Sequence, residues 1–117
     1  MAAVLFTADL ACSSKVAGAA ARTARRVETA MSVASLVEKG AGAELIILDL
    51  MTPAADPGEL LPRLRALTPP PISVIAFGPH VNERRLAAAR EAGCDEVITR
   101  GQFHSRLDDL LLRYVST

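Results

Sequence analysis

The stretch LIILDLMTP, residues 45–53, decides how the rest of this sequence is interpreted. Its first four residues are apolar on both alternating faces, which is typical of a central strand in a parallel sheet that helices cover on both sides. The run ends in Asp49, and Pro53 follows four residues later. We therefore expect Asp49 at the carboxyl end of a buried strand, which is where open α/β sheets hold their ligands.

Four more short apolar runs alternate with stretches of helical periodicity. The pattern predicts strands at 3–7, 27–30, 45–48, 73–77 and 96–99, with helices at 11–24, 32–39, 59–67, 83–92 and 103–115. Pro62 is tolerable if its helix starts near Glu59, so that the missing N–H falls in the unpaired first turn. Asn82 and Gly93 are a suitable cap and stop for the fourth helix. This order predicts one α/β domain with a parallel sheet and helices on both faces.

The bulk composition narrows the class of protein. The chain has 117 residues, enough for one core, and half of them are hydrophobic. Lys plus Arg and Asp plus Glu number 13 each, so no net charge draws the chain toward nucleic acid or a membrane. Two distant cysteines, the absence of a basic leader and the lack of a long apolar run favour a cytoplasmic protein. We expect a single domain over residues 1–117 with no effector domain.

Several segments resemble the receiver domain of bacterial response regulators. Residues 45–53 resemble the family signature, in which the third strand ends in the phospho-accepting aspartate and a proline follows. Residues 27–30, 59–67 and 87–95 resemble the family's second strand, third helix, and fourth helix with its exit loop. The resemblance covers nearly the whole chain. It implies a flavodoxin-like (βα)5 three-layer sandwich with strand order 2-1-3-4-5, acting in two-component or phosphorelay signal transduction and not as an enzyme.

The resemblance also implies a site. Asp49 would be the phospho-acceptor, and Mg²⁺ would be held by Asp9, Asp49 and the backbone carbonyl of Met51. Phosphoryl transfer to a carboxylate requires a nucleophilic oxygen, a divalent cation and fixed donors for the phosphoryl oxygens. Mg²⁺ accepts such a set because it prefers oxygen ligands and often uses only one or two carboxylates.

The sequence departs from the family pattern at four places on this edge. Aligned by Asp9, Ala8 replaces the first of two acids, and Gly78 replaces the Ser or Thr that follows strand four. Arg100 replaces the family lysine, and Val97 stands at the aromatic switch position. Arg keeps the charge but is not equivalent to Lys. We therefore expect an atypical receiver, or pseudo-receiver, that keeps the fold, binds Mg²⁺ weakly if at all, and has lost or altered phosphorylation.

Other functions stay open beside this interpretation. The chain could be an ordinary receiver phosphorylated at Asp49 with Mg²⁺. It could also be a ligand- or anion-binding module, in which Gly78 opens space and Arg100 attracts an anion. An enzyme on the same fold lacks support, because no nucleophile elbow or GxGxxG motif is present.

Partner and metal expectations follow from the same alignment. A sensor kinase or a downstream effector would bind through the face formed by residues 82–115, and the chain would be a monomer or a homodimer. Cys12, His80 and His104 would lie near the Asp49 edge, but their spacing matches no zinc motif. Cys94 is expected to be a small core residue.

Overall fold

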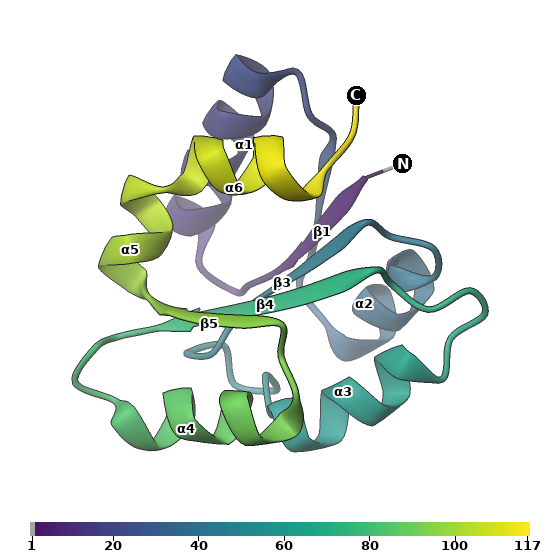
Figure 1. Cartoon of the computed structure of the whole chain (residues 1–117), viewed down its shortest axis with the longest axis vertical. Helices are drawn as coiled ribbons and strands as arrows, with labels where there is room; N and C mark the ends of the chain where they lie inside the picture. The colour runs from purple at the N-terminus through teal and green to yellow at the C-terminus, as the bar shows by residue number, and fades with distance from the viewer. Residues whose placement is uncertain (1) are drawn as a thin grey trace.

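A five-stranded parallel sheet organises the molecule (Figure 1). The computed structural model describes residues 2–117. The strands are β1 (Ala3–Phe6), β2 (Val27–Ala30), β3 (Leu45–Asp49), β4 (Ser73–Gly78) and β5 (Glu96–Thr99). They are ordered β2-β1-β3-β4-β5. The predicted strands are thus confirmed to within one residue, and so is the predicted strand order.

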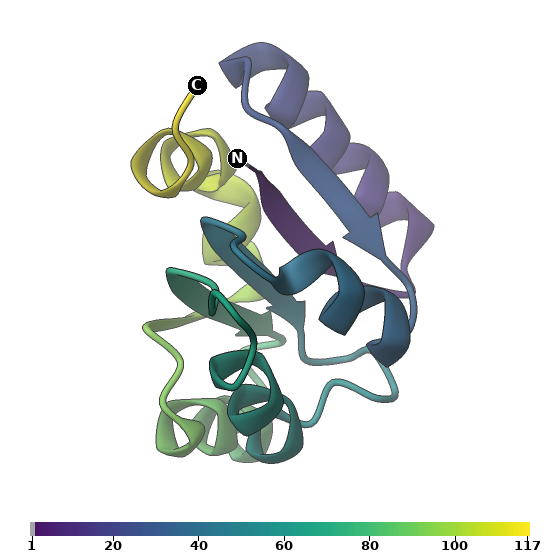
Figure 2. The same cartoon turned by 90° about the vertical axis from the view of Figure 1, so that its right-hand side faces the viewer.

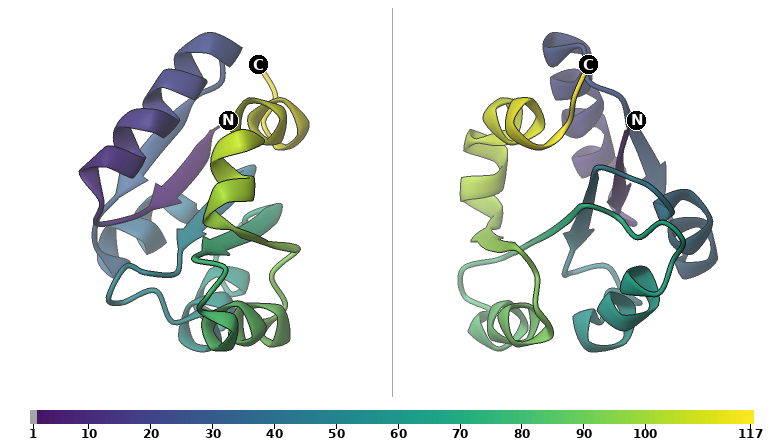
Figure 3. Two further views of the ribbon diagram at one scale, coloured as in Figure 1. Left: turned by 90° about the vertical axis from the view of Figure 1, so that its left-hand side faces the viewer. Right: turned by 45° about the vertical axis from the view of Figure 1, so that its right-hand side comes forward.

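Helices cover both faces of the sheet, because the strands alternate apolar side chains between them. One face carries α1 (Leu10–Thr23), α5 (Arg100–Ser105) and α6 (Leu107–Tyr114), and the other carries α2 (Val33–Gly40), α3 (Pro57–Arg65) and α4 (Glu83–Ala92). In β3, Leu45 and Ile47 pack toward the first face, whereas Ile46 and Leu48 pack toward the second. Figure 2 shows helices α2, α3 and α4 beside the sheet, and Figure 3 shows α1 next to α6.

Two helices differ from the sequence prediction. The third helix begins at Pro57, two residues before the expected start, because Asp56 caps it by accepting a hydrogen bond from the Gly58 N–H. Pro62 consequently lies inside the helix and not in its first turn. The last predicted helix is divided into α5 and α6 at Arg106, whose backbone is not helical.

The fourth helix follows the prediction closely. The Asn82 side chain accepts a hydrogen bond from the Arg85 N–H, and Gly93 ends the helix with φ of 96°. Glycine is suited to this left-handed position because it has no Cβ to clash with the backbone.

The C-terminal residues are fastened to the edge of the sheet where the strands begin. The Ser116 N–H and hydroxyl both donate to the Glu44 carboxylate, and Arg25 Nε donates to the Val115 carbonyl at 2.7 Å. The Glu44 N–H also donates to the Ala2 carbonyl, so the C-terminal residues lie near Ala2 and the start of β1. Within residues 2–117, no helix combines the length and apolar character needed to cross a membrane.

Candidate functional site

Asp49 is the central group of the opposite edge, where the strands end. It is the last residue of β3, lies between β1 and β4, and has only 2% of its surface exposed. The Thr7 hydroxyl donates to its Oδ2 at 2.8 Å, and the Met51 N–H donates to its Oδ1 at 3.1 Å. Each carboxylate oxygen thus has a donor, which is what a buried carboxylate requires.

Two threonines connect the loop after β1 to the loop after β3. Besides contacting Asp49, the Thr7 oxygen accepts a hydrogen bond from the Asp9 N–H at 3.0 Å. The Thr52 hydroxyl oxygen accepts from the Ala8 N–H at 3.1 Å. Both threonines are buried. Sequence reasoning missed them, because an uncharged residue after a strand gives no signal of a site, and the contact partners lie 42 and 44 positions away.

Asp9 does not occupy the place expected for it. Strand β1 ends at Phe6, so Asp9 lies beyond the strand end and is the N-cap of α1. Its Oδ1 accepts hydrogen bonds from the Ala11 and Cys12 N–H groups, and the side chain is exposed to solvent. The side chain after β1 that contacts Asp49 is therefore that of Thr7 and not that of Asp9.

Three further positions differ from the family pattern, and none of them forms a hydrogen bond or an ion pair with the Asp49 side chain among residues 2–117. They are Gly78, Arg100 and Val97. A Cβ built on Gly78 would lie 3.4 Å from Leu50 Cβ and 3.7 Å from Leu86 Cδ2. A Cβ there would thus make ordinary van der Waals contact with Leu50 and Leu86, and the expectation that Gly78 opens space for a ligand stays a prediction. Arg100 is the first residue of α5 and is half-buried, and among residues 2–117 its guanidinium forms no ion pair with Asp49. Val97 is half-buried and packs on the α4 side of the sheet.

The first residues of α1 and the end of α5 surround the same edge. Cys12 is buried, and desolvation together with the nearby Asp49 and Asp9 carboxylates raises the pKa of its thiol to about 11. His104 contacts the edges of the Phe77 and Phe103 rings. Burial, followed by Lys15 and Arg100, lowers the His104 pKa. Both groups are therefore neutral at pH 7 and offer no nucleophile or cation to Asp49.

The expected Mg²⁺ ligands Asp9 and Asp49 both accept hydrogen bonds. Asp49 Oδ2 accepts from the Thr7 hydroxyl, and Asp9 Oδ1 accepts from two helix N–H groups, while the role of these residues in holding Mg²⁺ stays a prediction. Across residues 2–117, no three His, Cys, Asp or Glu side chains are grouped so that they could hold a metal ion. This result also gives no support to a zinc site at Cys12, His80 and His104. Cys94 is half-buried and packs against the core, as predicted.

Comparisons with known proteins agree on the architecture. No family model matches the sequence, and no curated protein matches it. Solved structures do match. A response regulator from Hahella chejuensis superimposes with a TM-score of 0.78 at 18% identity, covering 97% of this chain and 95% of the other.

The receiver domain of a sensor histidine kinase from Pseudomonas aeruginosa gives a TM-score of 0.77 at 14% identity, covering 97% and 96% of the two chains. The fold is that of a receiver domain. The BeF3-activated DrrB receiver domain also matches, with a TM-score of 0.76 at 19% identity and 97% of both chains covered. The Pseudomonas protein carries a magnesium ion in its active-site cleft. At such identities the receiver fold is shared, while the function of this chain has to be argued from its own residues.

Proposed function

We propose that this domain is a receiver-like signal-transduction module whose Asp49 edge is altered, so that Mg²⁺-dependent phosphorylation of Asp49 is weak or absent. The receiver fold and the position of Asp49 at the end of the central strand support a signalling role. The contacts of the Asp49 carboxylate support the alteration. The signal passes through contact with a protein partner and not through catalysis on a small substrate.

One observation carries the proposal: the Thr7 hydroxyl donates a hydrogen bond to Asp49 Oδ2 at 2.8 Å. In phosphorylation, a carboxylate oxygen of Asp49 would attack phosphorus while the bond from phosphorus to the leaving oxygen breaks. A carboxylate that approaches a phosphoryl group needs cations to offset the combined negative charge. Here the donor to Asp49 Oδ2 is a neutral hydroxyl, and no ion pair to Asp49 exists among residues 2–117.

Phosphorylation can be tested directly with acetyl phosphate and Mg²⁺, followed by intact-protein mass spectrometry. We expect no appreciable mass gain of one phosphoryl group, under conditions in which an ordinary receiver domain is labelled in parallel. Asp49→Asn is the matched control for labelling elsewhere. Stoichiometric labelling of the natural chain that disappears in Asp49→Asn would show that the site works as an ordinary receiver site.

The same chemistry predicts which substitutions would strengthen Mg²⁺ binding beside Asp49. Replacing Thr7 and Ala8 by Asp puts two carboxylates beside Asp49, and paired carboxylates favour a divalent cation. We expect the double variant to bind Mg²⁺ more tightly than the natural chain in a calorimetric titration. Equal Mg²⁺ affinity of the two proteins would contradict the role given to Thr7.

We also propose that a protein partner, a sensor kinase or a downstream effector, contacts the face formed by residues 82–115. This face contains α4, the edge strand β5, and helices α5 and α6. Leu112 on α6 is 50% exposed, and Val81 next to the face is 80% exposed. Large apolar side chains that remain in solvent are candidates for contact residues.

A photo-crosslinking amino acid tests this face in the cells that make the protein. It would be placed at position 112, with position 72 as the matched control, because Ile72 is equally apolar and 64% exposed but lies before β4. We expect a discrete crosslinked species from position 112 that position 72 does not give. Identical crosslinks from both positions, or none from 112, would reject the assignment.

A further inference from the structure

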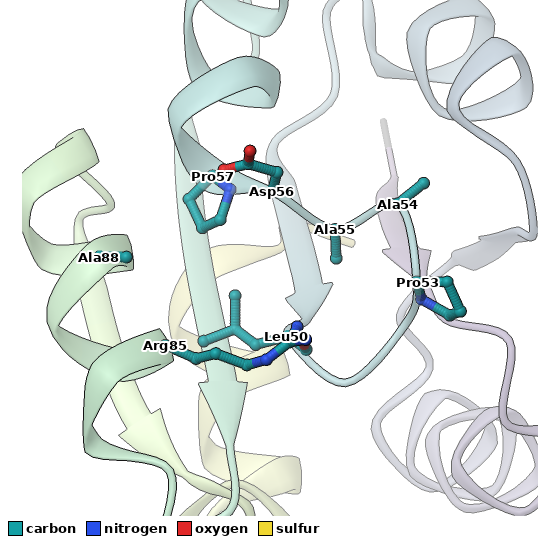
Figure 4. Close-up of a pocket in the computed structure, with 8 residues that line it drawn as sticks. All are labelled: Leu50, Pro53, Ala54, Ala55, Asp56, Pro57, Arg85 and Ala88. Carbon is teal, nitrogen blue, oxygen red and sulfur yellow. The ribbon is translucent and has the colours of Figure 1, made fainter.

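A pocket of about 410 Å³ lies between the loop that follows β3 and helix α4 (Figure 4). Its wall is largely apolar, with two charged side chains. The apolar lining comes from Leu50, Pro53, Ala54, Ala55, Pro57 and Ala88, and the charged residues are Asp56 and Arg85. The volume falls in the range of pockets that hold small molecules, which is roughly 300–1,000 Å³. Asp49 is not among the residues that line this pocket.

Arg85 is the unpaired charge of this pocket. Its side chain extends from α4 along the pocket, and one terminal nitrogen donates to the Leu50 carbonyl (Figure 4). The ion pairs formed within residues 2–117 do not include Arg85, and the Leu50 carbonyl is the one acceptor of its guanidinium there. A guanidinium has five N–H donors in a planar fork, so several of them remain available to an incoming group.

Asp56 does not cancel this charge. Its Oδ1 accepts a hydrogen bond from the Gly58 N–H at 3.0 Å, at the start of α3, where the helix dipole favours a negative charge. Its carboxylate is therefore engaged with α3, and it forms no ion pair with Arg85 among the described residues. The pocket consequently presents an apolar floor with an available cation at its α4 side.

From this arrangement we infer that the pocket binds a small amphiphilic carboxylate. Its apolar body packs against Leu50, Pro57 and Ala88, and its carboxylate accepts hydrogen bonds from Arg85. Arginine is suited to this role because its donors match the two oxygens of a carboxylate. Binding at this site does not require phosphorylation of Asp49, and it is additional to the proposed signalling function.

Binding at this site would reach Asp49 through one residue. Leu50 follows Asp49 directly, its N–H donates to the Phe77 carbonyl, and its carbonyl accepts from Arg85. A bound carboxylate competes with the Leu50 carbonyl for the Arg85 guanidinium. The loss of that hydrogen bond would shift the backbone that holds the Met51 N–H against the Asp49 carboxylate. This consequence rests on the proposed function, whereas the binding itself does not.

The probe for the site is 1-naphthoate, with neutral 1-naphthamide as the matched ligand of the same shape. At about 0.3 kcal/mol for each of its about 13 heavy atoms, naphthoate should bind with a Kd of about 1 mM. We would titrate each ligand to about 10 mM, an order of magnitude above that Kd, and follow backbone amide resonances by NMR. The expected result is saturable shifts of the Ala54, Ala55 and Ala88 amides, and an affinity for naphthoate about three- to tenfold above that for the amide.

Three variants define the site. Arg85→Met should reduce the preference for naphthoate over the amide to about one. The control is Arg84→Met, at the neighbouring α4 residue that does not line the pocket, and it should leave the preference unchanged. Ala88→Leu should weaken both ligands, because it fills the pocket. The readout does not involve phosphorylation, so it can fail or succeed independently of the proposed function.

Several outcomes would overturn the inference. The absence of shifts at the highest concentration, shifts centred outside residues 50–57 and 85–88, or an unchanged preference in Arg85→Met would each do so. A capped Leu-Asp dipeptide amide that bound more tightly than naphthoate at the same residues would assign the pocket to a protein segment instead.

Discussion

Replacing Thr7 by Val tests the contact on which the candidate site depends. The two side chains have nearly the same shape, so the substitution creates little empty space while it removes the hydroxyl that donates to Asp49 Oδ2 and accepts from the Asp9 N–H. Asp49 is 2% exposed, and water therefore cannot easily supply the lost donor. Hydrogen bonds to charged groups contribute about 1.5–3 kcal/mol. We expect Thr7→Val to lower the free energy of unfolding by about that amount, measured by urea denaturation with far-ultraviolet circular dichroism.

Thr52→Val is the matched control for this experiment. The Thr52 hydroxyl is equally buried, but it accepts a hydrogen bond from the uncharged Ala8 N–H. Its loss should therefore cost less, about 0.5–1.5 kcal/mol. In an Asp49→Asn background the charge is gone, and the cost of Thr7→Val should fall toward the Thr52→Val value. Two results would refute this reasoning. One is a loss of unfolding free energy in Thr7→Val that is no larger than in Thr52→Val, and the other is a loss that is the same with Asp49 and with Asn at position 49. Either would show that the hydrogen bond to the Asp49 charge does not stabilise the fold.

Two further predictions concern the glycines and Glu96. Gly78→Ala should stabilise the protein slightly, by about 0.5 kcal/mol, because a Cβ there makes ordinary contacts at 3.4 Å and a strand glycine carries an entropic cost. Gly93→Ala should instead destabilise the protein by about 1–2 kcal/mol, because the Gly93 φ of 96° is unfavourable for a residue with a Cβ. The melting temperatures of the two variants should therefore shift in opposite directions. Shifts of the same sign would contradict the assignment of the left-handed backbone at Gly93 as the cause. The Glu96 carboxylate accepts from the Tyr114 hydroxyl at 2.6 Å and pairs with Arg106, and these contacts lower its pKa below 4.5. Because the folded-state pKa is lowered, the contribution of the Glu96 charge to stability is complete above the unfolded-state pKa and is lost as the pH falls through the folded-state pKa. The cost of Glu96→Gln, about 1 kcal/mol or less at pH 7, should therefore disappear in acid. A cost that stays constant from pH 7 to below pH 4 would show that the charge of Glu96 is not involved.

The sequence was sufficient for the fold because the relevant signals are local. The apolar run that ends at Asp49 predicts a central buried strand, and the Asn82 cap with the Gly93 stop defines α4 almost to the residue. The exceptions also have local causes. Asp56 caps α3 earlier than expected, and this places Pro62 inside the helix.

The candidate site was less predictable because it depends on contacts between distant segments. A search for acids after β1 leads to Asp9, but Asp9 is the cap of α1, and the adjacent hydroxyl of Thr7 contacts Asp49 instead. The missing side chain of Gly78 suggested open space, and the structure shows that Leu50 and Leu86 lie at contact distance from a Cβ there. Neither result could be read from residue types, since both depend on which side chains the fold brings together.

The attachment of Ser116 to Glu44 has a practical consequence for handling the protein. This contact holds the C-terminal residues at the edge of the sheet where the strands begin, whereas Asp49 lies at the edge where they end. A fluorescent dye or an affinity handle joined after Thr117 would therefore emerge on the side away from Asp49. Immobilisation through that end should leave the Asp49 edge facing the solution, so partners and ligands can be screened on a surface without blocking that edge.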